Sequence, residues 1–331
     1  MRDSSTQFSN LINEDDPDAI TGEIVEIIEM VFPRFDFGPS MEACEDVARL
    51  FRGDYPGFHH CNLVYHDLHH TMLVTLAMAR LMHGAVVEGH QLTEEDFNLG
   101  LISALMHDTG YIQRSDDLEG TGAKYTLVHI DRSIDFVEEY YRNNPRPGVQ
   151  QQFFRDILFC TGFSTKIGEI HFPDERVALL GKMMGTADLL GQMADRCYLE
   201  KLHHLYDEFV EGGITEFTSP LDLLEKTREF HQMTLKRFAG ELGGVNRFAR
   251  HHFRKRWGID EDLYEKAIDA NMVYLNDLVS RLREDYRGGL RRTLPGAGIQ
   301  ETLPGGRISL ETKPAKYGAG KIPEAARGAG R

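Results

Sequence analysis

Apolar residues recur every three or four positions along most of the chain, which is the period of an amphipathic helix. No stretch alternates between apolar and polar residues with the period of two that is typical of a half-buried strand. The pattern predicts helices over residues 21–32, 40–51, 66–81, 93–110, 125–141, 151–161 and 179–193, and helix throughout 195–286. We therefore expect an all-α fold, a helical bundle with additional C-terminal helices.

The two ends of the chain differ in composition from this helical body. Residues 1–20 are polar and acidic, and we expect a flexible N-terminal tail there. Residues 287–331 contain ten glycines and four prolines, and a segment with so few apolar residues is typical of disorder. The predicted organisation is thus one helical domain over 21–286, with a core at 64–193 and C-terminal helices at 194–286.

The composition of the chain limits the compartment and the kinds of partner that we expect for the protein. No run of about eighteen apolar residues exists, so we expect no membrane span. The four cysteines form no CxxC pair, which indicates reduced thiols and a cytoplasmic protein. Net charge is −15, and the segment from Arg287 onward carries nine Lys or Arg against three Glu, which leaves −21 for the rest (−15 − 6 = −21). So acidic a body argues against nucleic acid as a partner.

The most apolar predicted helix ends in two polar residues. Between Leu99 and Met106 the chain is apolar nearly all round, which is typical of a helix buried among other helices. His107 and Asp108 follow at once. An unpaired carboxylate in such a place would cost several kcal/mol. We expect a metal ion to compensate these two side chains.

Two other apolar helices carry matching ligands. His66 and His70 fall on one face of the helix that opens with YHDLHHT, and Asp188 lies on the apolar stripe of LLGKMMGTADLLGQM. Two imidazoles and two carboxylates suit a divalent first-row transition metal. The sequence therefore predicts one metal ion bound by the side chains of His70, His107, Asp108 and Asp188.

The order His70, His107-Asp108, Asp188 resembles the HD superfamily of metal-dependent phosphohydrolases. The YHxxxHT opening and the TADLL segment are most similar to its cyclic-nucleotide phosphodiesterase branch. This resemblance spans about residues 64–193 and implies an HD-domain bundle that hydrolyses a phosphoester of a small phosphorylated substrate, such as a nucleotide. It implies Mn, Fe, Zn, Co or Ni as the metal, with Mg or Mn at a second site if the centre is binuclear.

The resemblance also implies roles for two further histidines. In the phosphodiesterases the position of His66 supplies the general acid, which protonates the leaving oxygen after a metal-activated water attacks phosphorus. The alternative for His66 is a supporting or packing role. His129 lies twenty-one residues past Asp108, where many HD proteins carry a histidine, and it would contact a second metal or the phosphate. A structural role for His129 is the alternative.

Other positions depart from that pattern or leave it open. Phosphodiesterases usually carry a histidine three residues after the HD aspartate, where this chain has Tyr111, and their purine-binding glutamine has only Gln232 as a loose counterpart. The polar loop 113–124 is either a lid or a connector, and the pair His251-His252 predicts a surface helix. Two other functions stay open: an HD-type non-haem di-iron oxygenase, and a non-catalytic HD module that binds a nucleotide.

Overall fold

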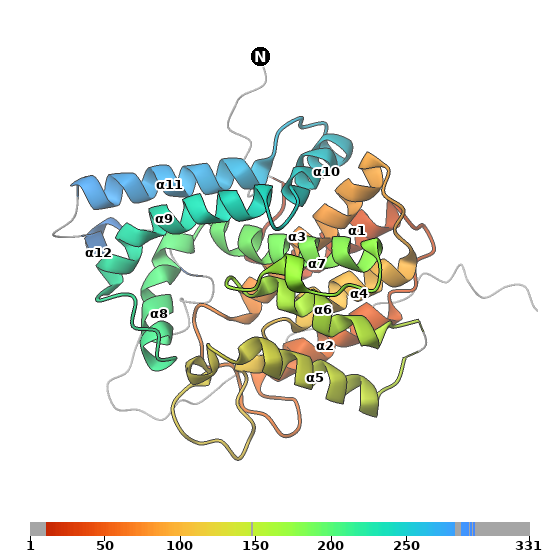
Figure 1. The fold of residues 1–331 in the computed structure, drawn as a ribbon, viewed down its shortest axis with the longest axis horizontal. Helices are drawn as coiled ribbons and strands as arrows, with labels where there is room; N and C mark the ends of the chain where they lie inside the picture. Colours follow the sequence, from red (N-terminus) through yellow and green to blue (C-terminus); the bar gives the residue numbers. More distant parts are fainter. Residues whose placement is uncertain (1–10, 147, 282–285, 291, 293, 295–331) are drawn as a thin grey trace, which may run out of the picture. The chain divides into compact units, whose positions relative to one another are not determined.

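The computed structural model describes residues 11–146, 148–281, 286–290, 292 and 294 (Figure 1). Within them the chain is all-α, as predicted: it forms twelve α-helices and no strand, apart from a single antiparallel bridge between Phe58 and Arg114. The α-helices are α1 Pro17–Glu29, α2 Gly38–Arg52, α3 Leu68–Glu88, α4 Glu94–Met106, α5 His129–Asn143, α6 Phe154–Leu158, α7 Glu175–Met193, α8 Tyr198–Glu211, α9 Pro220–Ala239, α10 Phe248–Trp257, α11 Leu263–Arg281 and α12 Tyr286–Gly289.

Polar side chains start several of these helices. Each accepts a hydrogen bond from a free backbone N–H of the first turn, which would otherwise lack a partner inside the helix. These N-caps are Asp16 of α1, Asp67 of α3, Thr93 of α4, Asp174 of α7 and Ser219 of α9. Thr93 forms a full capping box with Asp96.

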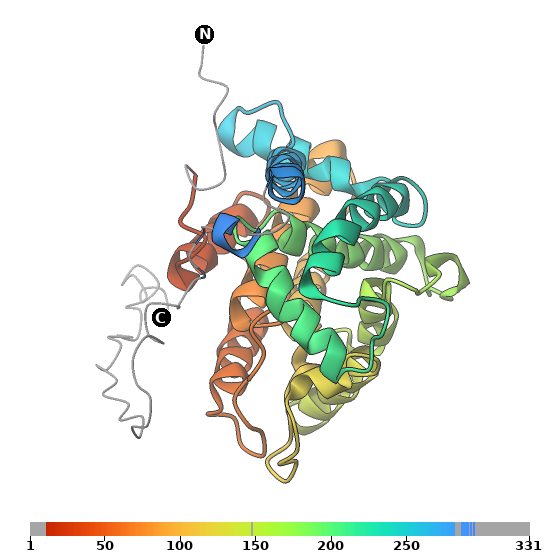
Figure 2. The ribbon, with the colours of Figure 1, turned by 90° about the vertical axis from the view of Figure 1, so that its left-hand side faces the viewer.

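Helix α3 lies at the centre of the bundle and packs against α1, α4, α7 and α10 (Figures 1 and 2). Gly84 allows the closest of these approaches, because a Cβ atom there would lie 1.9 Å from the carbonyl oxygen of Phe248 in α10. By length and composition α3 could cross a membrane, but 89% of its apolar window is buried inside the protein. That burial is what the central helix of a bundle requires.

Both predicted tail boundaries need correction. The N-terminal helix begins at Pro17 and not at residue 21, because Asp16 caps it and Ile20 is already fully buried. At the other end packing continues beyond residue 287. Arg292 donates a hydrogen bond to Asn271 Oδ1 (2.7 Å) and another to the carbonyl of Arg196. The predicted tails over 1–10 and 295–331 lie outside the described residues.

Candidate metal centre

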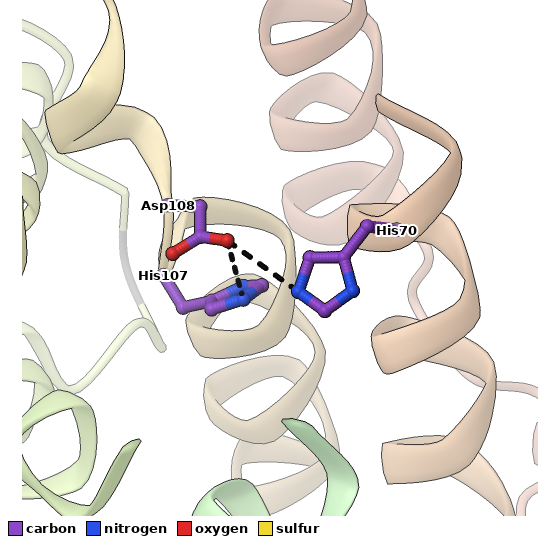
Figure 3. Close-up of side chains that lie close together, drawn as sticks. All are labelled: His70, His107 and Asp108. Atoms are coloured by element: carbon purple, nitrogen blue, oxygen red, sulfur yellow. Dashed lines mark ion pairs between the residues drawn. The ribbon is translucent and has the colours of Figure 1, made fainter. Parts of the chain in front are cut away.

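Three polar side chains meet in the core where α3 faces the end of α4 (Figure 3). His70, His107 and Asp108 are 4%, 2% and 3% exposed, and one ligand atom from each lies within 4.8 Å of the others. Asp108 Oδ2 is 3.1 Å from His107 Nε2 and 3.5 Å from His70 Nε2. Two imidazole nitrogens and a carboxylate oxygen thus converge on one small, dry volume.

Helix α7 brings the fourth predicted ligand to the same place. Asp188 Oδ1 lies 3.4 Å from His70 Nε2 and 3.8 Å from His107 Nε2. The structure therefore brings together all four side chains that the sequence nominated, from three segments far apart in the chain. Asp188 is more exposed than the other three, so the cluster reaches solvent on its α7 side. Metal binding by these residues stays a prediction.

The hydrogen bonds of His107 indicate what the cluster lacks. His107 Nδ1 donates to the carbonyl oxygen of Ala104 at 2.8 Å, which leaves Nε2 with a lone pair. That lone pair faces Asp108 Oδ2, and both atoms are buried with no hydrogen-bond partner among the described residues. Two acceptors held 3.1 Å apart repel each other unless a proton or a metal ion lies between them. A cation would satisfy both atoms at once.

The electrostatics of the cluster favour positive charge. Burial alone would lower the pKa of His70, but the neighbouring carboxylates of Asp108 and Asp188 outweigh it and raise that pKa to about 10. The pKa of Asp108 is held well below its usual range, because its two neighbouring imidazoles outweigh its own burial. An environment that attracts a proton this strongly attracts a metal cation for the same reason.

His129 lies on the far side of Asp108. Its Nδ1 donates to the carbonyl of Thr126 at 2.7 Å, and its Nε2 lies 3.9 Å from Asp108 Oδ1. Gly110 permits this approach, since a Cβ atom there would lie 1.9 Å from the carbonyl oxygen of His129. Burial lowers the pKa of His129, which keeps the ring neutral as a metal ligand must be. A role for His129 as a ligand of a second metal stays a prediction.

His66 sits at the mouth of the cluster, but not on the helix where the sequence placed it. Helix α3 starts at Leu68, because Asp67 caps it, so His66 belongs to the preceding turn. Its ring still lies 6.0 Å from that of His70, centroid to centroid. The His66 side chain is 15% exposed, so it can meet a substrate.

The partner that holds His66 is Glu208 of α8, which the sequence did not reveal. Glu208 Oε2 lies 2.7 Å from His66 Nδ1. Its Oε1 accepts hydrogen bonds from the backbone N–H groups of Val64 (3.2 Å) and Tyr65 (2.9 Å). One buried carboxylate thus fixes the turn and the imidazole together. Because Nδ1 of His66 carries the proton shared with Glu208, Nε2 is the ring nitrogen that remains available to give or take a proton.

Tyr111 lies between the two outer histidines. Its ring stacks on His66 with centroids 4.4 Å apart and on His129 with centroids 4.5 Å apart. Tyr111 occupies the position where the resembled phosphodiesterases have a further histidine. Here an aromatic side chain that is 2% exposed packs both rings in place. At this position a packing contact replaces the further imidazole of the phosphodiesterases, and both histidine rings are still held in place.

A buried ion-pair network supports the start of α3 from the same helix α8. Lys201 Nζ lies 3.1 Å from Asp195 Oδ2, 3.7 Å from Asp67 Oδ1 and 3.3 Å from His69 Nδ1. Lys201 is buried, and Asp67 caps the helix that carries His70.

Two other sequence candidates lie elsewhere. Gln232 is exposed, so it is not part of the buried cluster. His252 was predicted on a surface helix, but it is fully buried against His83 of α3. Within the loop 113–124 the side chain of Gln113 donates to the carbonyls of Asp117 and Glu119, and Lys124 pairs with Asp117; its role as a lid or a connector stays a prediction.

Comparison with known proteins gives one partial match. Residues 114–242 match the model of a family described as Npun_R2479-like, which includes the segments that carry His129, Asp188 and Glu208 but not His70, His107 or Asp108. No HD-domain family model matches the chain. No curated protein and no solved structure matches the chain. What the findings establish is a helical protein with a buried His-His-Asp group that could hold a metal ion.

Proposed function

We propose that the protein is a metal-dependent hydrolase of the HD type that cleaves a phosphoester in a small substrate, with a nucleotide as the expected class. The observation that carries the proposal is the pairing of two parts. One is the buried cluster of His70, His107, Asp108 and Asp188; the other is His66, which Glu208 holds beside it. A metal cluster alone would fit many functions, but a restrained histidine next to it supplies an acid.

The residues of the chain divide the work as follows. His70, His107, Asp108 and Asp188 would hold the metal, which supplies positive charge for the phosphate and lowers the pKa of a bound water. His66 delivers a proton from Nε2 to the departing oxygen, and Glu208 stabilises the imidazolium through Nδ1. Tyr111 keeps the ring of His66 from rotating out of the site.

The charge of the site explains why a metal is needed for this substrate. Asp108, Asp188 and Glu208 place three carboxylates around the histidines. Basic side chains on neighbouring segments are engaged elsewhere: Lys124 pairs with Asp117, and Arg132 donates to the carbonyls of Gly110 and Ile112. Such a site would repel a phosphate group in the absence of bound cations.

The test combines metal content with hydrolysis. Purified protein is loaded in turn with manganese, iron, cobalt, nickel and zinc, and each form is assayed on cyclic nucleotides, nucleoside monophosphates and a generic phosphodiester. We expect hydrolysis by the wild type and its loss in Asp108→Asn together with the metal. His66→Gln should keep the metal and lose hydrolysis. Unchanged metal content in Asp108→Asn and His107→Ala would overturn the assignment.

One observation favours a second candidate, an HD-type di-iron oxygenase. His129 presents Nε2 toward Asp108 Oδ1 at 3.9 Å, which is where a second iron would need a ligand. The two candidates differ in what they consume. An iron-loaded oxygenase takes up oxygen in the presence of substrate, and the hydrolase turns over equally well under nitrogen.

A further inference from the structure

A cleft lies between α2 and α5, and the metal cluster contributes nothing to its lining. The cleft there has a volume of about 400 Å³, within the range of roughly 300–1,000 Å³ that small-molecule sites occupy. Its floor is aromatic and consists of Tyr55, Phe58, Phe136 and Tyr140. We call this site the aromatic cleft.

The floor offers a flat ring a place to stack. The rings of Tyr55, Phe58 and Phe136 lie 5.6–6.0 Å apart, centroid to centroid, and each pair is tilted or edge-to-face. Phe136 is 8% exposed, whereas Tyr55 and Phe58 are half-buried. A planar ligand that covers partly exposed aromatic rings is stabilised by burying their apolar surface.

The rim has unused hydrogen-bond donors. Arg49 donates to Asp46 Oδ1 (2.8 Å) and to the carbonyl of Asp54 (3.3 Å), and Arg114 donates to Glu139 Oε2 (2.6 Å). Each guanidinium has most of its N–H groups left over. The side chains of these two arginines are 49% and 52% exposed.

Both carboxylate oxygens of Asp46 in the cleft already accept hydrogen bonds. Asp46 Oδ1 accepts from Arg49, and its Oδ2 accepts from the hydroxyl of Tyr140 at 3.0 Å. The guanidinium groups already lie over the rings, Arg49 5.8 Å from the centroid of Tyr55 and Arg114 5.1 Å from that of Phe58. The cleft thus holds two arginines and two carboxylates, Asp46 and Glu139, and the arginines keep free N–H donors that an anionic ligand can use.

We propose that the aromatic cleft binds an anion that carries a flat aromatic ring, of which a nucleoside monophosphate is the representative. The ring packs against the half-buried ring of Tyr55, and the anionic group lies between the guanidiniums of Arg49 and Arg114. Asn143 and Asn144, which line the end of the cleft on the α5 side, place amide groups where the polar edge of such a ring can be recognised.

The experiment measures binding of adenosine 5′-monophosphate to the full chain by calorimetry in excess EDTA, so that no metal at the buried cluster retains the nucleotide. Arg49→Gln and Arg114→Gln should each weaken binding at least about tenfold, because each removes a charge-assisted hydrogen bond. Tyr55→Leu should weaken it similarly. Arg155→Gln is the matched control, since Arg155 is 48% exposed, pairs with Glu138 and lies over Phe159 outside the cleft; it should leave binding unchanged.

Other outcomes would overturn the proposal. They are no binding at about 5 mM nucleotide, equal binding in the wild type and in both arginine variants, and inorganic phosphate or adenosine binding as tightly as the nucleotide. Repeating the titration in Asp108→Asn separates this site from the buried cluster. The cleft keeps its affinity there even if the proposed hydrolase activity is absent, and a loss of binding in that variant would place the nucleotide at the cluster.

Discussion

Helix α3 buries two histidines, and each meets a histidine from another segment. His70 lies beside His107, with ring centroids 5.4 Å apart, and His83 lies beside His252 of α10, with centroids 4.9 Å apart. All four side chains are at most 4% exposed. In ring geometry and burial the two pairs are nearly alike, yet their charge environments are opposite.

The charges around each pair decide its chemistry. Asp108 and Asp188 raise the pKa of His70 to about 10 in spite of its burial. Burial, with the positive charges of Lys255 and Arg256, lowers the pKa of His83 to about 4. The pKa of His252 is lowered well below its ordinary value by burial and by Arg80. A buried histidine pair is therefore a candidate metal site only where carboxylates accompany it; beside cations it is a neutral packing contact.

The comparison predicts its largest difference for metal binding. We expect Asp108→Asn to lose the bound metal and the hydrolytic activity together, because the cluster then has one carboxylate fewer for the cation. His83→Ala removes an equally buried imidazole from the same helix and should keep full metal content. Metal analysis by plasma emission on both proteins, with circular dichroism to verify folding, checks this. Metal retained in the first variant, or lost in the second, would break the distinction between the pairs.

A smaller loss should follow from changing the proposed acid. In His66→Gln we expect kcat to fall by about 10²- to 10⁴-fold, the usual contribution of a general acid, with metal content unchanged. The loss should shrink for a substrate whose leaving group is acidic, such as p-nitrophenolate, because that oxygen departs without a proton. A uniform loss across leaving groups would contradict the role of His66 as the acid.

Glu208 should matter less than the residue it holds. We expect Glu208→Gln to lower kcat by about 10- to 100-fold, the range for partners that orient functional groups, with little change in KM. The amide still bonds the backbone N–H groups of Val64 and Tyr65 through its oxygen, so the turn stays folded. Leaving-group dependence identifies the effect: it should resemble that of His66→Gln. A rise in KM alone would assign Glu208 to substrate binding instead.

How much could be predicted from the sequence depends on whether a residue differs in polarity from its neighbours in the chain. The all-α fold and the juxtaposition of His70, His107, Asp108 and Asp188 were predictable, because polar residues interrupting apolar helices need a common explanation. Glu208 was not, since α8 is amphipathic and its charged residues looked solvated. Only its spacing hinted at burial: Lys201 and Glu208 are seven residues apart, on the face that also buries Leu205.

The contact between His83 and His252 could not be predicted for a different reason. His83 stands in an apolar run, MHGA, but His252 stands among arginines and lysines, ARHHFRKRW, which is the composition of a solvated helix. Burial of His252 depends on Gly84, which lets the backbone of α10 approach α3. Contacts between segments about 170 residues apart leave no local signature. The apolar pattern also places the starts of α1 and α3 wrongly, because Asp16 and Asp67 cap these helices.

The smallest predicted effect concerns stability and distinguishes the second pair. The pKa of His83 is lowered from 6.5 to about 4, so the unfolded chain binds a proton more readily than the folded one. The stability that this group contributes is present above about pH 6.5 and is lost as the pH falls to about 4. Between pH 7 and pH 5 we expect the free energy of unfolding to fall by about 2 kcal/mol on account of His83.

Substitution of the pair should remove this acid sensitivity. Urea denaturation of the wild type and of His83→Gln/His252→Gln at pH 7 and pH 5 gives the difference between the two proteins at each pH. In that difference the contributions of other titrating groups cancel, since His70 lies about 20 Å away along α3. We expect the wild type to lose its advantage at pH 5. If both proteins lose the same stability on acidification, the pair is not a buried neutral contact, and burial without carboxylates would no longer account for the contrast with the metal cluster.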